Sequence, residues 1–352
     1  MRWFTPGLTL TGSIGVVIAL ITGQISLPSL DDIRGTEPPV YDDPIAATLP
    51  RSEQIAGRPP LAEVAPVALA TASRSRTTRK SDRHIKIATF NIQTFGKSKA
   101  EKPDVMDTLA RIFMIFDVVA VQELKGDPSI PINSLFERLH RLGARYDAIV
   151  SDPLGRSSQT ERYAFVWDTT RVQLVRESAY LVADSADRMH RQPYVATFQA
   201  RVNPIDSRRP FSFSLINVHT DPDEVKGDSP RNELNVLDDV FIRVRQWEYD
   251  RSGQEDFFLL GDLNVDSKNL QQLGQIPNLV SVVGDQVTAP KSGKTYDHIL
   301  MDRVVTQEWT GQASVLDVSQ YLTNGRLTVS DVSDHLPVWA EFDIYEIPPS
   351  GY

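Results

Sequence analysis

Six hydrophobic runs of the sequence end in polar residues that can bind a hard cation or move a proton. The runs are "ATFNIQ", "VVAVQE", "LINVHT", "FLLGDLN", "YDHI" and "SDHLPV", and their polar residues are Asn91, Glu123, His219, Asp262, Asn264, Asp297, Asp334 and His335. Each alone has an ordinary explanation, because Asp and Asn are common in turns. Six such endings in one chain indicate a shared site, since ligand sites in α/β proteins gather where strands end.

The side chains at these ends suit the hydrolysis of a phosphodiester. The carboxylates and amides are oxygen ligands, which favour Mg²⁺, Mn²⁺ or Ca²⁺ over zinc. They are Glu123, Asp262, Asp334, Asn91 and Asn264. The two histidines can also serve as zinc ligands, but proton transfer is favoured because each has a candidate carboxylate partner. Two imidazoles and a cation would activate water, protonate the leaving oxygen and offset phosphoryl charge.

The segments around these residues predict interleaved strands and helices from residue 84 onward. "HIKIATFNI" alternates as a strand does, and residues 104–116 place apolar side chains on one helical face. Further helices are predicted around residues 132–139 and over residues 230–248, with several consecutive strands between them. The expected fold class is α/β, a layered sandwich of two mixed β-sheets flanked by helices.

The composition excludes several kinds of site. The chain has 352 residues, a net charge of −9 and no cysteine. The net negative charge argues against sequence-independent electrostatic binding of nucleic acid, because such binding needs basic residues to displace counterions. A carboxylate-built metal site remains compatible with it. The absence of cysteine excludes disulfides, cysteine nucleophiles and thiolate zinc sites.

The N-terminal segment predicts export. Residues 8–27 are uncharged and long enough to cross a bilayer, with Arg2 before them and Asp31 and Asp32 after them. The positive-inside bias then places the remainder of the chain outside the cytoplasm. We interpret residues 1–30 as an uncleaved membrane anchor, because no A-x-A site follows the apolar run. The alternative is a cleaved signal segment, which would leave the protein secreted. A buried helix is the third interpretation.

The rest of the chain divides by composition. Residues 31–83 are rich in proline and end in the basic run "RSRTTRKSDR", as expected of a flexible linker. Residues 84–347 are the expected catalytic domain, which we take to be monomeric, and residues 348–352 are a short tail.

Taken in order, the motifs "FNI", "QE", "NVH", "GDLN", "YDHI" and "SDHLPV" resemble the endonuclease/exonuclease/phosphatase superfamily. "ATFNIQTFG" and "SDPLGRSSQTERYAFVW" (residues 151–167) are similar to its deoxyribonuclease I branch in particular. The resemblance covers residues 84–345 and implies a fold of two packed sheets and a divalent-metal-dependent hydrolase. DNA is the substrate that it implies.

The resemblance also implies a role for each site residue. His335 with Asp297 resembles the general base, and His219 with Glu161 the general acid, although either imidazole can serve as base. The implied metal ligands are Glu123, Asp334 and Asn91. Asp262 and Asn264 would hold a second cation or the scissile phosphate, and Arg191 would contact phosphate.

Two positions depart from the resemblance. Deoxyribonuclease I probes the DNA minor groove with an arginine and a tyrosine where this chain has Gln93 and Gln159. Glutamine can hydrogen-bond to DNA but brings neither charge nor a stacking ring. The first hypothesis is therefore a metal-dependent endonuclease; the second is a phosphodiesterase or phosphatase acting on a lipid or phosphoinositide, and the third a non-catalytic binding module.

Overall fold

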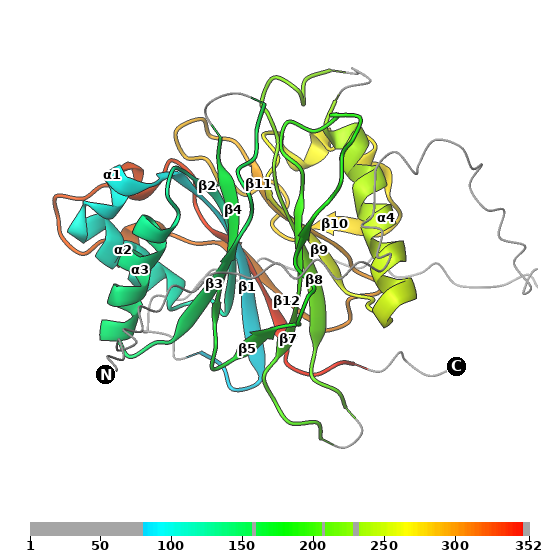
Figure 1. Ribbon diagram of the computed structural model, residues 1–352, viewed down its shortest axis with the longest axis horizontal. Helices are drawn as coiled ribbons and strands as arrows, with labels where there is room; N and C mark the ends of the chain where they lie inside the picture. Colours follow the sequence, from blue (N-terminus) through cyan, green and yellow to red (C-terminus); the bar gives the residue numbers. More distant parts are fainter. Residues whose placement is uncertain (1–79, 157–159, 206–207, 228–231, 348–352) are drawn as a thin grey trace, which may run out of the picture.

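The computed structural model describes residues 80–156, 160–205, 208–227 and 232–347 (Figure 1). The predicted anchor, residues 31–79 of the predicted linker, the C-terminal tail and Gln159 lie outside the described residues. Within these ranges no helix combines the length and the apolar character needed to span a bilayer. Lys80, which falls within the predicted linker, contacts the domain: its Nζ lies 2.7 Å from Asp168 Oδ2.

The first of two sheets is built around the strand that opens the domain. Across the sheet, its strands are β12 (Trp309–Val315), β13 (Val338–Asp343), β1 (His84–Phe95), β2 (Val118–Leu124), β4 (Arg162–Asp168) and β3 (Tyr146–Val150). Strands β1 and β2 are parallel and the other neighbours are antiparallel, so the sheet is mixed.

The second sheet has the same mixed character. Across it lie β10 (Leu279–Ser281), β11 (Asp297–Asp302), β9 (Phe257–Asp262), β8 (Ser212–His219), β7 (Tyr194–Ala200) and β5 (Val172–Leu174), with β6 (Tyr180–Leu181) also paired to β7. Strands β8 and β9 are its parallel pair. The predicted sandwich of two mixed sheets is confirmed.

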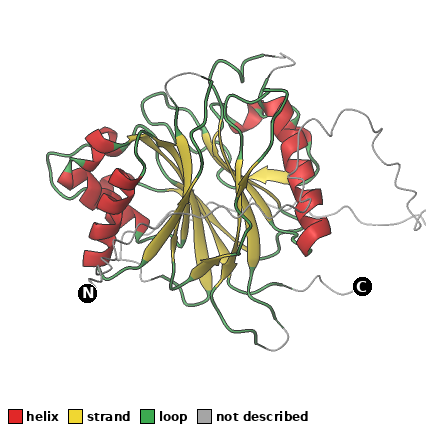
Figure 2. Ribbon diagram, viewed as in Figure 1, coloured by secondary structure: helices red, strands yellow, loops and turns green. Residues whose placement is uncertain are grey.

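Helices cover the outer face of each sheet (Figure 2). The first sheet carries α1 (Lys97–Ala100), α2 (Pro103–Phe113), α3 (Ser129–Arg141), α5 (Val329–Val332) and the 3₁₀ turn η4 (Val318–Tyr321), and the second carries α4 (Leu234–Ser252) with η2 (Ser267–Asn269) and η3 (Leu273–Gln275). The helices predicted over residues 104–116 and 230–248 form as α2 and α4, with shifted ends. Helix α4 continues to Ser252 because Gly253, at φ +70°, supplies the left-handed cap that ends it.

Side-chain alternation assigns each strand residue to one of three layers. In β9, Phe258 and Leu260 pack between the sheets, while Phe257 and Leu259 pack under α4. Phe258 stacks on Phe342 of the opposite sheet at 4.7 Å between ring centroids. Burial on both faces explains the continuous hydrophobic run of β9.

A polar contact crosses the largely apolar layer between the sheets. Gln122 Nε2 of β2 donates to Asn217 Oδ1 of β8 at 2.6 Å, and Gln122 also bonds Thr89 of β1 at 3.0 Å. All three side chains are fully buried. Gln122 immediately precedes Glu123, and Asn217 lies two residues before His219. The bridge therefore lies in the core next to the strand ends that carry the predicted site residues.

Candidate active site

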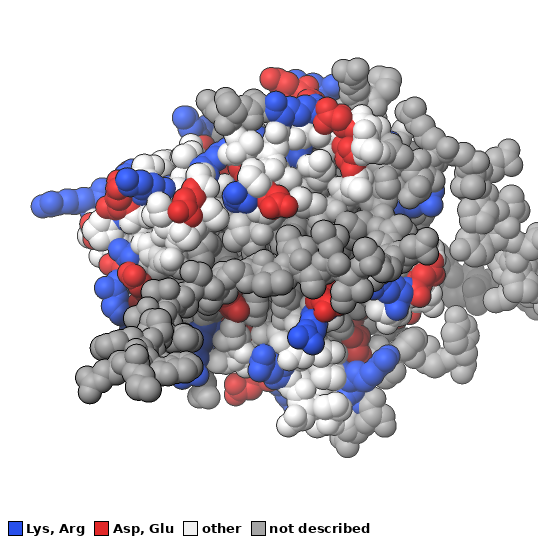
Figure 3. Space-filling view, in the orientation of Figure 1, with Lys and Arg blue, Asp and Glu red and all other residues white. Residues whose placement is uncertain are grey.

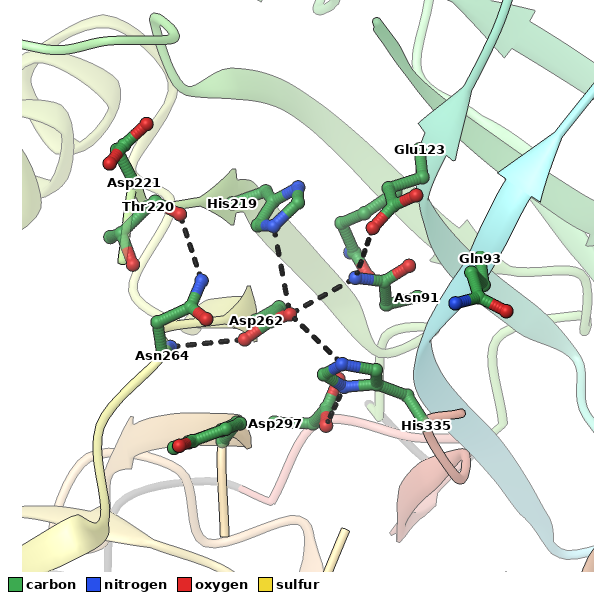
Figure 4. A network of polar contacts seen from close by, with 12 residues as sticks. Asn91, Gln93, Glu123, His219, Thr220, Asp221, Asp262, Asn264, Asp297 and His335 are labelled. Atoms are coloured by element: carbon green, nitrogen blue, oxygen red, sulfur yellow. Dashed lines mark hydrogen bonds and ion pairs between the residues drawn. The ribbon is translucent and has the colours of Figure 1, made fainter. Parts of the chain in front are cut away.

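Asp262 lies at the centre of the converging strand ends (Figure 4). Its Oδ2 is 3.6 Å from His219 Nε2 and 3.5 Å from His335 Nε2. The same oxygen accepts a hydrogen bond from Asn91 Nδ2 at 3.0 Å. Asp262 is 1% exposed, so these groups surround a buried carboxylate.

The period of the strands explains why these side chains meet. Residues two apart on a strand face the same side. Hydrophobic residues that pack between the two sheets lie an even number of positions from each polar residue of the site, namely Asn91, Glu161, His219, Asp262 and Asp297. The polar residues therefore end the same layer that the aromatic core fills. Parallel pairing also places His219 directly beside Asp262.

Gly261 permits this approach of β8 and β9. Its φ is +146°, and a Cβ at this position would lie 1.8 Å from the carbonyl oxygen of Val218. A side chain is therefore excluded both by conformation and by contact. The glycine before Asp262 is therefore required by the short distance between β8 and β9.

Each histidine is held by a buried carboxylate through Nδ1. His219 Nδ1 donates to Glu161 Oε1 and His335 Nδ1 donates to Asp297 Oδ2, both at 2.7 Å. Protonation at Nδ1 leaves each Nε2 to exchange protons. Burial disfavours the charged rings, but contact with Glu161 raises the pKa of His219, and contact with Asp297 raises the pKa of His335 to about 10.

The His335–Asp297 pair predicts how stability depends on pH. A ring whose folded pKa is raised stabilises the fold fully below its ordinary value of 6.5 and loses that contribution as pH rises through about 10. In EDTA, unfolding free energy should fall about 2 kcal/mol more in the wild type than in His335→Gln/Asp297→Asn between roughly pH 7 and 9, because the double variant lacks both titrating groups of the pair. Urea denaturation at each pH measures this difference, and parallel curves for the two proteins would contradict it.

Besides its contact with His219, Glu161 forms ion pairs with two basic side chains. Arg191 Nε lies 3.0 Å from Glu161 Oε1, and Lys125 Nζ lies 3.1 Å from Oε2. Burial alone would raise the pKa of Glu161, but His219 and these cations lower it to about 2. Arg191 also donates to the carbonyl oxygen of His219 at 3.1 Å. The arginine predicted to contact phosphate thus lies beside the His219–Glu161 pair.

Asn91 and Glu123 offer oxygens that fit a hard cation. Asn91 Nδ2 donates to Glu123 Oε1 at 3.1 Å, while Asn91 Oδ1 is buried without a hydrogen-bond partner. Glu123 has a φ of +62°, which breaks the alternation of β2 and turns its carboxylate toward Asn91. An unpartnered amide oxygen beside a carboxylate is a suitable pair of ligands for Mg²⁺, Mn²⁺ or Ca²⁺.

The remaining predicted residues lie around this centre. Asp334 accepts from Gln93 Nε2 at 2.9 Å, so the glutamine that replaces a groove-probing arginine is engaged with a predicted metal ligand. Asn264, at φ +54°, donates its backbone N–H to Asp262 Oδ1 at 3.0 Å. Asp262, Asp297 and His335 also offer ligand atoms within 4.8 Å of one another.

The comparison with known families now decides the relationship. The model of the Endonuclease/Exonuclease/phosphatase family matches residues 88–335, from β1 through His335. The chain belongs to the endonuclease/exonuclease/phosphatase family. The resemblance drawn from the motifs is confirmed.

Relatives within this family carry deoxyribonuclease names. The chain is 29% identical over 274 residues to deoxyribonuclease gamma of Rattus norvegicus, covering 72% of this chain and 83% of the relative. It is 30% identical over 275 residues to deoxyribonuclease-1-like 1 of Homo sapiens, covering 74% and 84%. Among solved structures, an endonuclease/exonuclease/phosphatase family protein from Bacteroides thetaiotaomicron matches with a TM-score of 0.49 at 16% identity, covering 74% of this chain and 98% of that one.

Sequence reasoning missed three residues that position the candidate site. Ser333 Oγ donates to the Asn91 carbonyl at 2.7 Å and accepts from the N–H groups of Gln93 and His335 at 3.1 and 3.2 Å. Lys99 Nζ donates to the carbonyl of Val332 at 2.6 Å and so supports the same loop. The "SDH" run offered a signal for Ser333; nothing local indicated Lys99.

The third missed residue is Glu233, which joins two loops of the site. Its Oε1 accepts from His190 N and its Oε2 from Asp221 N, both at 2.6 Å. His190 precedes Arg191, and Asp221 follows His219 by two residues. Glu233 is fully buried before α4, so one carboxylate holds the loops on either side of the His219 pair.

Glu233→Gln is expected to lower kcat/KM for phosphodiester cleavage about tenfold. Glutamine keeps one acceptor oxygen and leaves one partly buried N–H without its partner, at a cost of about 1 kcal/mol. Steady-state kinetics and thermal unfolding measure the two effects side by side. Glu137→Gln, an exposed change of the same type on α3, is the control; equal kcat/KM in the two variants would show that Glu233 does not position the site.

Proposed function

We propose that the domain is a divalent-metal-dependent endonuclease that hydrolyses DNA. The observation that carries this proposal is the pair of carboxylate-bound imidazoles whose Nε2 atoms face the same oxygen of Asp262. Two positioned proton carriers are what attack by water and departure of an alcohol oxygen require. DNA is proposed as substrate because the relatives named above are called deoxyribonucleases.

The chain's own residues supply the proton transfers. Nε2 of His335 takes a proton from the attacking water, and Nε2 of His219 gives one to the leaving oxygen. Asp297 and Glu161 keep the Nδ1 protons in place and stabilise each ring while it is charged. A cation held by Asn91, Glu123 and Asp334 would offset phosphoryl charge and lower the pKa of both rings.

Binding to DNA is proposed to depend on local contacts around the site. On the face shown in Figure 3, lysine and arginine side chains are interspersed with aspartate and glutamate. Arg191 and Lys125 are the cations beside the His219 pair, and both already contact Glu161. A small number of phosphate contacts predicts weak affinity with a shallow salt dependence.

A plasmid assay tests the proposed function. The full chain incubated with supercoiled plasmid and Mg²⁺ should convert it to the nicked form, and EDTA should stop the reaction. The double variant His219→Ala/His335→Ala is the control for a contaminating nuclease. If the plasmid survives while a phosphoinositide or bis-p-nitrophenyl phosphate is hydrolysed, DNA is the wrong substrate and the phosphodiesterase alternative replaces it.

We also propose that the N-terminal segment places this domain outside the cytoplasm. The proposal rests on the uncharged residues 8–27 between Arg2 and Asp31. Protease added to intact cells should digest the domain, and protection until the cells are lysed would contradict export.

A further inference from the structure

Three carboxylates lie together at the end of the sheets opposite the active site. Asp256 immediately precedes β9, Glu308 precedes β12 and Glu346 follows β13. Each offers a ligand oxygen, and these oxygens lie within 4.8 Å of one another. Strand β9 spans 6 residues from Phe257 to Asp262, so at about 3.3 Å per residue Asp256 lies roughly 20 Å from Asp262. The cluster is therefore separate from the catalytic residues.

These carboxylates lack the partners that another buried acid of this chain has. Asp256 is 5% exposed and Glu308 3% exposed. Within the ranges that the structure describes, no lysine, arginine or histidine forms an ion pair with any of the three, whereas Asp117 pairs with both Lys80 and Arg171. Buried carboxylates are normally paired or bound to metal, because an unbalanced buried charge is costly.

A second observation points to a ligand. Asp256 Oδ1 is buried and has no hydrogen-bond partner. Of the neighbouring carboxylates, Glu308 Oε1 accepts from Ile347 N at 2.6 Å and Glu346 Oε1 accepts from Ser212 N at 2.9 Å. The side chains of Glu308 and Glu346 also form a hydrogen bond with each other. Backbone N–H groups thus orient two carboxylates beside a third that has an unsatisfied oxygen.

We propose that Asp256, Glu308 and Glu346 form a structural binding site for a hard divalent cation of the calcium class. Calcium accepts carboxylates in one- or two-oxygen contact and tolerates irregular geometry, whereas Mg²⁺ demands an octahedron and retains water. The ligands come from both sheets, since β9 belongs to the second and β12 and β13 to the first. A bound cation would cross-link the two sheets in a chain that has no disulfide.

Calcium titration of the full chain tests this site. Glu123→Gln serves as the background, because it weakens binding at the active site. Isothermal titration with CaCl₂ after removal of metal should show one more calcium per chain in Glu123→Gln than in Glu123→Gln/Asp256→Asn. Calcium at about 100 times its Kd should also raise the Tm of the background protein by roughly 5–10 °C, and this shift should disappear in the double variant.

Matched variants make the outcome decisive. Glu255→Gln, an exposed acid next to Asp256, should leave the calcium count and the Tm shift unchanged. If Asp256→Asn does not fold, Glu346→Gln at the more exposed edge of the cluster replaces it. An equal calcium count with and without the cluster overturns the proposal; the cluster would then hold protons only, since burial raises the pKa of Asp256 to about 8 and that of Glu346 to about 7.

Discussion

His335→Ala and His219→Ala should each lower kcat for plasmid cleavage by about 10²–10⁴-fold, the usual contribution of a positioned proton carrier. Each ring reaches the site with Nδ1 bound to a carboxylate at 2.7 Å and Nε2 turned to Asp262. Losing either ring therefore removes one of the two proposed proton transfers. The double variant should fall little below the slower single variant, because the two rings act in one reaction.

His140→Ala is the matched control, since this histidine is exposed at the end of α3. It should cleave plasmid at the wild-type rate. Circular dichroism of all variants separates loss of chemistry from loss of fold. Wild-type kcat in a single variant would show that the imidazole removed there carries no proton transfer.

Gly261→Ala should lower the free energy of unfolding by about 4 kcal/mol or more, placing it among the most damaging single substitutions. The new Cβ would lie 1.8 Å from the Val218 carbonyl oxygen, so β8 and β9 would have to separate. Backbone atoms cannot move aside as a flexible side chain can. Urea denaturation measures the loss, and nicking activity should fall with it because the two strands position His219 and Asp262.

Gly143→Ala provides the comparison for Gly261. Its φ is +82°, but nothing lies within 4 Å of the position that a Cβ would take. It should therefore cost only the conformational penalty of a left-handed residue, about 1–2 kcal/mol. Similar losses in both variants would mean that β8 and β9 are not held as closely as the structure shows.

Much of the site could be predicted because the residue pattern of a strand and of its end is contained in a short stretch of sequence. A hydrophobic run that ends in Asp262 or His219 is visible in the sequence, and the period of two fixes which side its polar residue faces. The sequence alone did not specify which faces of which strands meet. That choice depends on packing between Phe258 and Phe342, residues 84 positions apart in the chain.

Other features escaped prediction because they depend on backbone conformation or long-range contacts. Glu123 reaches the site through a φ of +62°, which no pattern of residue types revealed. Glu233 precedes a helix and looks like an ordinary surface acid, yet it is buried under two loops. Helix α4 ends later than the predicted residue 248, because the apolar pattern weakens before Gly253 caps the helix.

The buried bridge from Gln122 to Asn217 has a consequence for the whole molecule. Two apolar faces can slide past each other with small changes in energy, but a 2.6 Å hydrogen bond between them is satisfied in one alignment only. That alignment determines whether Asn91 and Glu123 on one sheet come opposite Asp262 and His219 on the other. The geometry of the candidate site is thus specified partly from inside the core, by two fully buried amides.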